Sequence, residues 1–302
     1  MENLNYHSVI CFGEVLWDIL PSSTVPGGAP MNVAYHLHKL KKNPALITSV
    51  GMDEKGKGLI NIFSEHGVCT TFFQRNLDYE TGKVYAVSNE HYEVVYDIVM
   101  PVSWDFIEWN ENLDDLVSRA DYFVYGSLAA RNHVSKKTLF QLLESAKNKV
   151  LDINLRPPHF DKRIVEELLA KADFLKINFA ELELITRWFS KYLNMDDRLK
   201  FITEKFNIPN VVVTLGGNGA LLYFNSNKYD HKGFPVEVKD TVGSGDAFLA
   251  GLLSKFSENS PPADALEYAN GMGAFIASQT GGCPDYDINQ VENLINEKKQ
   301  SK

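Results

Sequence analysis

The most informative stretch of this sequence is DTVGSGDAF, residues 240–248, which opens a predicted helix over residues 247–256. Its two glycines allow the backbone to take a positive φ and to approach a ligand closely. The free N–H groups of the first helical turn then converge on one point, with the positive end of the helix dipole behind them. The stretch therefore predicts an anion hole, formed by Gly243, Ser244 and Gly245 and suited to a phosphoryl group.

Asp246 stands where a carboxylate would repel a bound anion. Its position fits a general base that accepts the proton of an attacking hydroxyl group. The alternative is that Asp246 is only a favourable acidic residue in a first helical turn, preceded by a plain glycine-rich loop. The loop is neither a Walker A sequence, which needs Gly-Lys-Ser/Thr, nor the dinucleotide pattern Gly-x-Gly-x-x-Gly.

Outward from this loop, short apolar runs alternate with amphipathic segments along the whole chain. That alternation indicates βαβ units around a mostly parallel sheet. The predicted strands are residues 9–12, 45–50, 122–125, 150–153, 174–177, 211–214 and 236–238, and one predicted helix covers residues 31–42. We therefore expect an α/β fold with helices on the faces of the sheet.

Residues 70–100 depart from this pattern, because they are rich in Val, Tyr, Phe and Thr and alternate with a period of two, with a turn signal at residues 89–91. The segment predicts a β-hairpin inserted into the α/β chain. A sheet of this size is not stable alone. It must therefore cover the main domain, a ligand site or the same sheet of a second copy.

The composition excludes several partners. The 302 residues carry a formal net charge of −9, whereas a nucleic-acid or anionic-membrane surface needs clustered Lys and Arg. The three cysteines, Cys11, Cys69 and Cys283, are widely spaced, which fits free thiols in a reducing compartment. The apolar stretch near the N-terminus is too short for a signal sequence or a spanning helix. We expect a soluble, cytoplasmic protein that binds neither nucleic acid nor membrane.

Residues 240–248 resemble the second signature of the PfkB, or ribokinase-like, carbohydrate kinases, Asp-Thr-x-Gly-Ala-Gly-Asp-x-Phe, with Ser244 in place of the usual Ala. Further matches follow in family order over nearly the whole chain. Gly13-Glu14 followed by Asp18 resembles the opening strand of the family. GGAPMNVA at residues 27–34 resembles the form of the first signature that is typical of fructokinases.

The resemblance implies that Asp18 and Asn32 hold sugar hydroxyls, while Gly27 and Gly28 let the backbone lie against the sugar. Fixed carboxylate and amide groups are suited to distinguishing a polyol from an apolar isostere. Standing alone, the two polar residues would be interpreted as helix-capping or turn residues. Met31 replaces a small residue of the motif, and either reshapes the sugar pocket or simply packs.

Arg156 ends the segment Asp152-Ile153-Asn154-Leu155-Arg156, which matches the family at the end of a predicted strand. Doubly wound sheets bind ligands at such strand ends. A guanidinium group suits phosphate oxygens, so we expect Arg156 to reach the phosphoryl region or the sugar. The alternative is an Arg–Asp pair at the surface.

Two cation sites follow from the resemblance. Asn178 and Glu181 match the Asn-x-x-Glu motif, which implies that Asn178 lies by the nucleotide and that Glu181 holds Mg²⁺ through water. By itself the same spacing is more typical of a helix capping box. Asp240 and Thr241, with the loop at residues 281–282, resemble the monovalent-cation site of many members, which would take K⁺.

The loop at residues 214–220 resembles the family loop beside the ATP phosphates and ribose, with Thr214, Gly216 and Gly219 as the matching positions. Asn270 matches an asparagine near the adenine. Without the family, the loop would be interpreted as a hairpin turn.

The resemblance implies a ribokinase-like, doubly wound, mostly parallel sheet flanked by helices, within one domain spanning residues 1–302. It also implies a small β-sheet lid at about residues 70–100, to which residues 20–27 contribute, and which closes over the sugar. Such lids often pair between subunits, so we expect a homodimer.

The implied activity is that of a sugar kinase that uses ATP and Mg²⁺, with Asp246 as base and the Gly243–Gly245 backbone and Arg156 stabilising the developing charge. The form of the first signature favours fructose, with the 6-hydroxyl as acceptor. Ribose or 2-keto-3-deoxygluconate are alternative substrates, and a catalytically silent sugar-binding regulator is an alternative of another class. A Rossmann oxidoreductase is disfavoured by the missing dinucleotide pattern.

Overall fold

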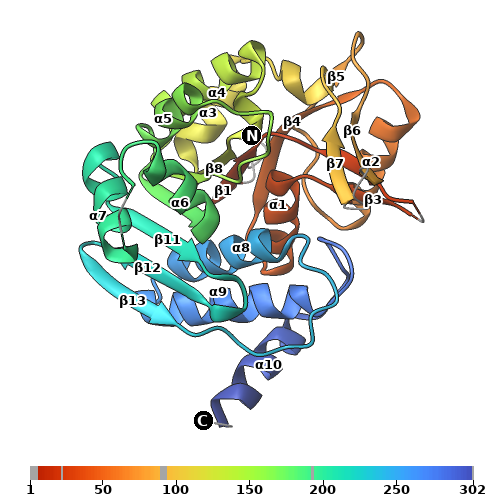
Figure 1. The fold of residues 1–302 in the computed structure, drawn as a ribbon. Helices are drawn as coiled ribbons and strands as arrows, with labels where there is room; N and C mark the ends of the chain where they lie inside the picture. The colour runs from red at the N-terminus through yellow and green to blue at the C-terminus, as the bar shows by residue number, and fades with distance from the viewer. Residues whose placement is uncertain (1–5, 22, 89–93, 192–193, 301–302) are drawn as a thin grey trace.

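Two β-sheets of different size form the framework of the described part of the chain (Figure 1). The computed structural model describes residues 6–21, 23–88, 94–191 and 194–300, and within them a large sheet has nine strands in the order β13-β12-β11-β10-β9-β8-β1-β4-β5. Its strands are β1 (Val9–Phe12), β4 (Pro44–Gly51), β5 (Phe73–Asn76), β8 (Tyr122–Gly126), β9 (Lys149–Asp152), β10 (Phe174–Asn178), β11 (Asn210–Thr214), β12 (Ala220–Phe224) and β13 (Asn227–His231). Neighbours from β11 to β5 pair in parallel, and β12 and β13 continue the sheet antiparallel.

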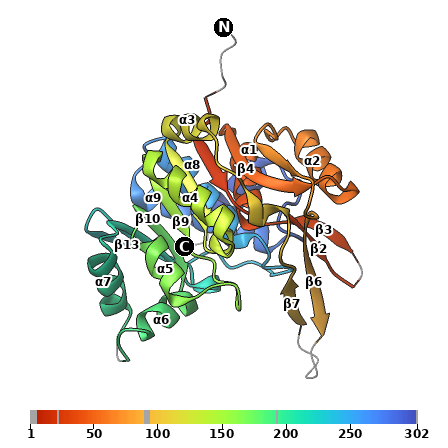
Figure 2. The ribbon, with the colours of Figure 1, turned by 90° about the horizontal axis from the view of Figure 1, so that it is seen from above.

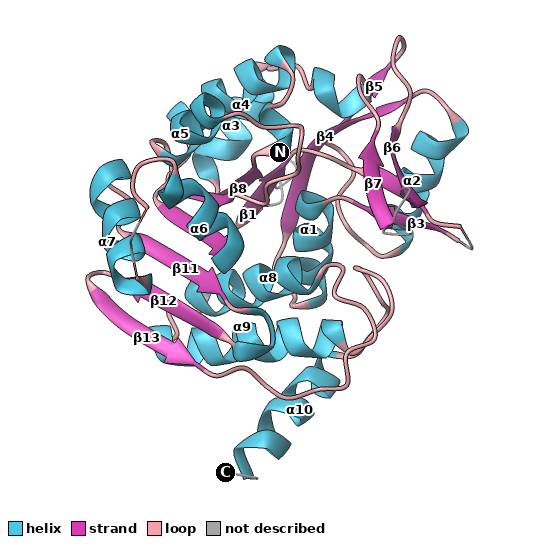
Figure 3. Ribbon diagram, in the orientation of Figure 1, coloured by secondary structure: helices cyan, strands magenta, loops and turns pink. Residues whose placement is uncertain are grey.

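Helices cover both faces of this sheet (Figure 3). One face carries α3 (Glu111–Arg119), α4 (His133–Ser145), α5 (Lys162–Leu169), α6 (Phe179–Arg187) and α7 (Met195–Phe206); the other carries α1 (Ala29–Lys39), α2 (Glu54–Glu65), α8 (Ser244–Ser257) and α9 (Pro262–Ala277), with α10 (Ile288–Gln300) packed on α9. Strand residues alternate between the two apolar layers, as Ile10 and Phe12 do against Val9 and Cys11. A strand buried on both faces needs such a continuous apolar run. The predicted doubly wound α/β fold is confirmed.

The order of the strands creates a place for a ligand. β1 lies between β4 and β8, and the chain builds the sheet outward from β1 in both directions. In doubly wound sheets the crevice at such a switch point lies beyond the carboxyl ends of the strands. Residues that follow β1, β8, β9 and β10 are therefore brought to one edge of the sheet.

A second, small sheet extends from the body (Figure 2). In the described part of the chain it contains four strands in the order β3-β2-β6-β7, namely β3 (Thr24–Gly27), β2 (Leu16–Ile19), β6 (Gly82–Ser88) and β7 (Val94–Ile98). The segment expected at 70–100 thus divides between the sheets, because β5 pairs with β4 in the large sheet while β6 and β7 form the hairpin. The turn predicted at residues 89–91 lies outside the described residues.

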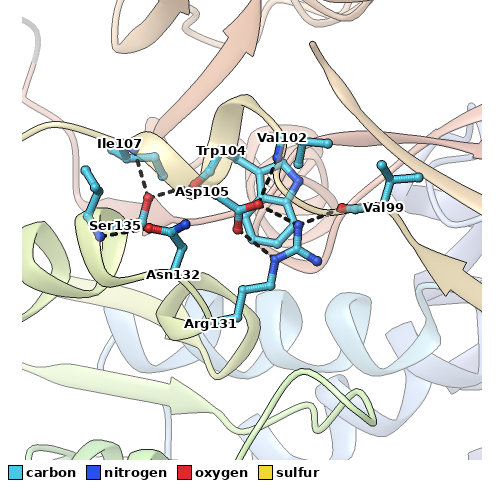
Figure 4. A network of polar contacts seen from close by, with 9 residues as sticks. Val99, Val102, Trp104, Asp105, Ile107, Arg131, Asn132 and Ser135 are labelled. Atoms are coloured by element: carbon cyan, nitrogen blue, oxygen red, sulfur yellow. Dashed lines mark hydrogen bonds and ion pairs between the residues drawn. The ribbon is translucent and has the colours of Figure 1, made fainter. Parts of the chain in front are cut away.

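A buried ion pair ties the end of β7 to the body (Figure 4). Arg131, just before α4, donates to both carboxylate oxygens of Asp105 at 2.7 and 2.8 Å and to the carbonyl of Val99 at 2.8 Å. Asp105 also accepts from the N–H of Val102, and the guanidinium group stacks on Trp104 at 3.8 Å. The chain that leaves the small sheet is therefore held by a bidentate, fully buried pair.

One predicted strand is wrong. Residues 236–238 form an irregular segment between β13 and α8, and the following N–H groups of Lys239 and Asp240 donate to the carbonyl of Ala277. An apolar run in the sequence is typical of a strand, but a strand also needs a partner strand to bind its backbone N–H and C=O groups.

A helix that crosses a membrane requires both sufficient length and sufficient hydrophobicity. None of the helices of the described residues meets both requirements.

Candidate active site

Asp246 lies at the meeting point of two helix N-termini. It is 8% exposed in the first turn of α8 and accepts a hydrogen bond from Asn32 Nδ2, in the first turn of α1, at 2.8 Å. Burial raises the pKa of the Asp246 carboxyl to about 6, and the charge of Asp152 acts in the same direction. The opposing influences of Lys176, Asn32 and Arg156 keep the pKa low enough for ionisation at neutral pH. A carboxylate with such a pKa can serve as a base.

The start of α8 differs from the starts of α2 to α7. Those six helices each begin at an Asp or Asn whose side chain accepts a first-turn N–H. The N-cap of α8 is Gly243, with φ +74° and no side-chain cap. The N–H of Ser244 already donates to the carbonyl of Thr241 at 3.3 Å, so it is less available than the predicted anion hole requires. Within the described chain, the N–H of Gly245 has no acceptor and remains open to a ligand.

The predicted sugar-binding residues lie together next to this helix start. The Asp18 carboxylate packs directly on Gly27, where a Cβ would come within 2.1 Å of Oδ2. Gly28 has φ +124°, and a Cβ there would lie 2.5 Å from the carbonyl oxygen of Glu14. Burial raises the pKa of Asp18 to about 6, against the nearby charge of Arg156. Met31 is buried in the core and so packs rather than lining a pocket.

Lys176 was missed by the interpretation of the sequence. It lies in β10, is buried, and forms an ion pair with Asp152 at 2.7 Å. A Cβ on Gly245 would be 3.3 Å from Lys176 Nζ, so the ammonium group lies beside the open N–H of α8. Burial favours a lower pKa for Lys176, but the charges of Asp152 and Asp246 outweigh it and raise the pKa. The sequence does contain an indication of its role, because Lys176 is a charged residue within the apolar run Phe174-Leu175-Lys176-Ile177, and a buried lysine needs a partner.

Arg156 follows the carboxyl end of β9 and is exposed. Among the described residues it has no carboxylate within ion-pair distance, so the surface-pair alternative is not observed. Its charge lowers the pKa of Asp18, Glu14 and Asp246, which places the guanidinium group near the sugar residues and the base. Within the segment from Asp152 to Arg156, Asn154 has φ +37°, so the backbone turns there and does not continue as a strand.

A cavity of about 190 Å³ lies on the other side of the α8 N-terminus. It is lined by four predicted nucleotide-contacting residues, Thr214, Gly216, Gly219 and Asn270, and by others that include Thr241, Ser244, Gly245, Val236 and Val238. A Cβ on Gly216 or Gly217 would meet no atom within 4 Å, so this turn faces open space. A larger, more open depression near residues 203–209 lies at the opposite, amino-terminal edge of β11 and contains none of the predicted residues.

Asn178 and Glu181 form a capping box at the start of α6, as the local pattern alone predicted. Glu181 accepts from the N–H groups of Leu155 and Asn178 at 2.8 and 2.9 Å, so both carboxylate oxygens are engaged. Asn178 is exposed and does not line the cavity. Among the described residues, no group of three acidic, His or Cys side chains could hold a metal ion directly.

Asp240 is engaged with the main chain on both oxygens. It accepts from the N–H of Val242 and from the N–H of Gly281, each at 3.0 Å. The carboxylate thereby joins the loop before α8 to the loop after α9. Its role with Thr241 in holding a monovalent cation stays a prediction.

Comparison with known proteins gives concordant results. The family model described as pfkB family carbohydrate kinase matches residues 10–289. A fructokinase of Vibrio alginolyticus is 29% identical over 89% of this chain and 92% of its own length.

Solved structures are also similar. A Vibrio cholerae O395 fructokinase, crystallised with fructose, ADP and a calcium ion, is 25% identical with a TM-score of 0.82, covering 96% of this chain and 100% of its own. A Xylella fastidiosa fructokinase with bound ATP has a TM-score of 0.87 at 22% identity over 96% and 98% of the two chains, and shares the fold.

Proposed function

Because this chain belongs to the pfkB family of carbohydrate kinases, and is therefore a sugar kinase, we propose that it transfers the γ-phosphoryl group of ATP to fructose. The observation that carries this proposal is the hydrogen bond between Asn32 and Asp246. This hydrogen bond connects the motif at residues 27–34 to the Asp246 carboxylate. The uncapped start of α8, which carries Asp246, also lines the cavity formed by Gly216 and Gly219. The fructokinase names of similar proteins support fructose as the sugar.

In the proposed reaction, Asp18 and Asn32 hold the sugar and Gly27 and Gly28 lie against it. Asp246 accepts the proton of the attacking hydroxyl group as its oxygen bonds to the γ-phosphorus and the bond to the ADP oxygen breaks. We assign the 6-hydroxyl of fructose as that group.

Positively polarised groups of the protein would stabilise the negative charge on the γ-phosphoryl group during transfer. The N–H of Gly245 and the helix dipole of α8 supply partial positive charge without a side chain. Lys176 adds a full charge beside Gly245, and the exposed Arg156 lies near enough to Asp246 to lower its pKa, so its guanidinium group is placed to bind the same phosphoryl group. The Lys176 side chain does not have to lose conformational freedom when the substrate binds, because its ammonium group is already held by Asp152.

The cavity on the far side of α8 is the proposed nucleotide site. Its turn at Gly216 and Gly217 leaves room for phosphates and ribose, and Asn270 marks the expected adenine end. Asn270 Nδ2 donates one hydrogen bond to the carbonyl of Leu266 at 2.7 Å, which leaves its carbonyl oxygen and its second N–H to face a base.

Mg²⁺ fits this site only as a hydrated ion. The carboxylate of Asp152 lies near Asp246 and that of Glu181 lies near Asp152, but they are engaged with Lys176 and with backbone N–H groups. Mg²⁺ normally keeps several waters and contacts few protein oxygens, so these carboxylates would hold it through water. When bound with ATP, the ion would neutralise phosphate charge.

A sugar panel tests the proposal. Purified protein with MgATP is assayed for ADP release against fructose, ribose and 2-keto-3-deoxygluconate, and the product with fructose is identified by ³¹P NMR. We expect the highest kcat/KM for fructose and fructose 6-phosphate as product. A higher kcat/KM for ribose or the keto acid would reject fructose, and sugar binding without any ADP release would favour the silent regulator.

A further inference from the structure

One face of α1 holds the loop that follows α9. Asn32, Tyr35 and His36 have the spacing i, i+3 and i+4, so they project from one side of the helix. Tyr35 Oη donates to the carbonyl of Pro284 at 2.8 Å, and His36 Nε2 lies 2.9 Å from the carbonyl oxygen of Gly282. The main chain of this loop is therefore fixed against the helix that carries Asn32.

The His36 ring has a single orientation and a single tautomer. It is fully buried, and burial lowers its pKa to about 4, so the ring is neutral at physiological pH. Because the Gly282 carbonyl only accepts, Nε2 carries the hydrogen and donates it. Nδ1 then accepts from Tyr286 Oη at 3.0 Å. Both ring nitrogens have a partner, which locks the loop in place.

The Asn32 amide lies between a hydrogen-bond acceptor, the Asp246 carboxylate, and a hydrogen-bond donor, the Cys283 thiol. Nδ2 donates to Asp246 Oδ2 at 2.8 Å, and Oδ1 accepts from the Cys283 thiol at 3.1 Å. An ionised carboxylate only accepts, while a thiol is a weak donor. Turning the amide over would set Oδ1 against the carboxylate and would leave the thiol hydrogen facing an NH₂ group. The two neighbours together therefore select one orientation.

Gly282 packs closely on two sides of this arrangement. A Cβ on Gly282 would lie 3.0 Å from Asn32 Nδ2. A Cβ on Gly243 would lie 2.5 Å from Gly282 Cα. Gly282 is thus packed between the amide and the N-cap of α8, and it sets Cys283 directly beside Asn32.

We propose that Cys283 is a positioning residue for phosphoryl transfer, whose thiol fixes the Asn32 amide with its NH₂ group toward Asp246 and the sugar. This inference rests on the proposed role of Asp246 as base. One Asn32 N–H is used by Asp246 and the other is left for the substrate. A sugar hydroxyl at that place accepts from Asn32 and keeps its own hydrogen for Asp246, which is the direction that proton transfer needs.

Other titratable and charged groups also lie near Asp246. They are Asp152 from β9, Lys176 from β10, Arg156 beyond β9, Glu14 after β1 and the buried thiol of Cys11 in β1. A substitution at Cys283 leaves all of them in place. A change in the titration of Asp246 in such a variant therefore reports on the Asn32 amide.

The test compares Cys283→Ala, Cys283→Val and Cys283→Ser with the unmodified chain. Ala and Val remove the donor, and Val also fills the volume of the thiol, whereas Ser keeps a donor. Cys69→Ala is the matched control, because Cys69 lies opposite Ala45 at the amino-terminal edge of the large sheet, away from Asn32. The Asp246 side chain is titrated by ¹³C NMR, and kcat is measured against pH with the best sugar.

Loss of the thiol weakens the hydrogen bond that favours the ionised Asp246, so we expect its titration midpoint to rise by about 0.5–1 pH unit in the Ala and Val variants. The acid limb of kcat should move by the same amount. Cys283→Ser and Cys69→Ala should retain the original midpoint.

An unchanged midpoint in both donor-free variants, or an equal shift in Cys69→Ala, would overturn the positioning role. The NMR titration needs no turnover, so it is independent of the proposed activity. Absence of ADP release with every sugar would reject the proposed function, whatever the NMR midpoint shows.

Discussion

At the scale of single residues, Asp246 combines burial with ionisation. Its pKa is raised to about 6 by burial and by Asp152, while Asn32 and Lys176 stabilise the charged form. The balance keeps the carboxylate ionised at neutral pH and still basic enough to accept a proton. A helix-start acid with a purely structural role would need neither the amide partner nor the buried charge pair.

We predict that Asp246→Asn lowers kcat by about 10²–10⁴-fold with KM for the sugar changed only a few-fold, because the amide cannot accept the proton. Steady-state kinetics with MgATP check this. Asp264→Asn is the control, since Asp264 is an acidic residue in the first turn of neighbouring α9. Turnover of Asp246→Asn within a few-fold of the unmodified enzyme would contradict the assignment.

The pH dependence follows from the same carboxyl group. The base works in its ionised form, so kcat should be level above about pH 7 and should fall below pH 6, the pKa of Asp246. Asp18, whose pKa is also about 6, contacts the sugar in the proposed complex, so its protonation should appear in KM. A profile of kcat and KM between pH 5 and 8 separates the two. A kcat that stays constant down to pH 5 would exclude Asp246 as the titrating base.

At the scale of secondary-structure elements, one buried ion pair joins the segment that follows β7 to the segment just before α4. Asp105 and Arg131 have side chains 0% and 2% exposed, and the guanidinium group bridges Asp105 and the carbonyl of Val99. Removing one partner leaves the other charge buried without compensation. The exposed pair of Arg119 and Asp115 provides a comparison in a solvated setting.

We predict that Arg131→Met lowers the free energy of unfolding by about 3–5 kcal/mol, whereas Arg119→Met changes it by less than about 1 kcal/mol. Urea denaturation followed by circular dichroism measures both. Equal effects of the two substitutions would show that the buried pair does not anchor the segment.

At the scale of the whole molecule, the small sheet presents apolar side chains to solvent. Tyr85 and Tyr96 are 38% and 53% exposed on strands that extend beyond the helices of the body (Figure 2). Val84 and Ile98 pair across β6 and β7 and are buried against Trp104 and Leu128. Because side chains alternate along a strand, Tyr96 shares their face of the hairpin, and Tyr85 lies on the opposite face. We propose that the sheet closes over the sugar and also pairs with the same sheet of a second copy, as exposed sheets with apolar side chains can do.

We predict that light scattering after size-exclusion chromatography gives about twice the 34.0 kDa of one chain at micromolar concentration. The double variant Tyr85→Ser/Tyr96→Ser should shift the mass toward that of one chain, because it removes the exposed tyrosine from each face of the hairpin and with it the apolar area of the contact. Phe179→Ser/Leu184→Ser removes two apolar groups of similar exposure from α6 and should not change the mass. A 34 kDa species for the unmodified chain would contradict the dimer.

Some features of this protein are determined by short segments of sequence. The alternation of apolar runs and amphipathic segments determined the α/β fold, because burial on both faces of a sheet requires a local pattern. The residues 240–248 specified an uncapped helix start followed by an acid, since backbone conformation at glycine and the direction of the helix dipole are local properties. The residues at 27–34, 178–181 and 214–220 likewise marked turns and helix starts that the structure contains.

Other features depended on which segments meet in space. Asn32 and Asp246 are 214 residues apart, Asn32 and Cys283 are 251 apart, and only the packing of α1 against α8 and the loop after α9 brings them together. In the sequence Lys176 is one residue of a predicted strand. Only the pairing of β10 with β9 places Asp152 beside it and forms the ion pair. Likewise, β5 joined the large sheet and residues 236–238 formed no strand. Strand pairing and side-chain contacts depend on neighbours supplied by distant parts of the chain, and local propensity does not encode them.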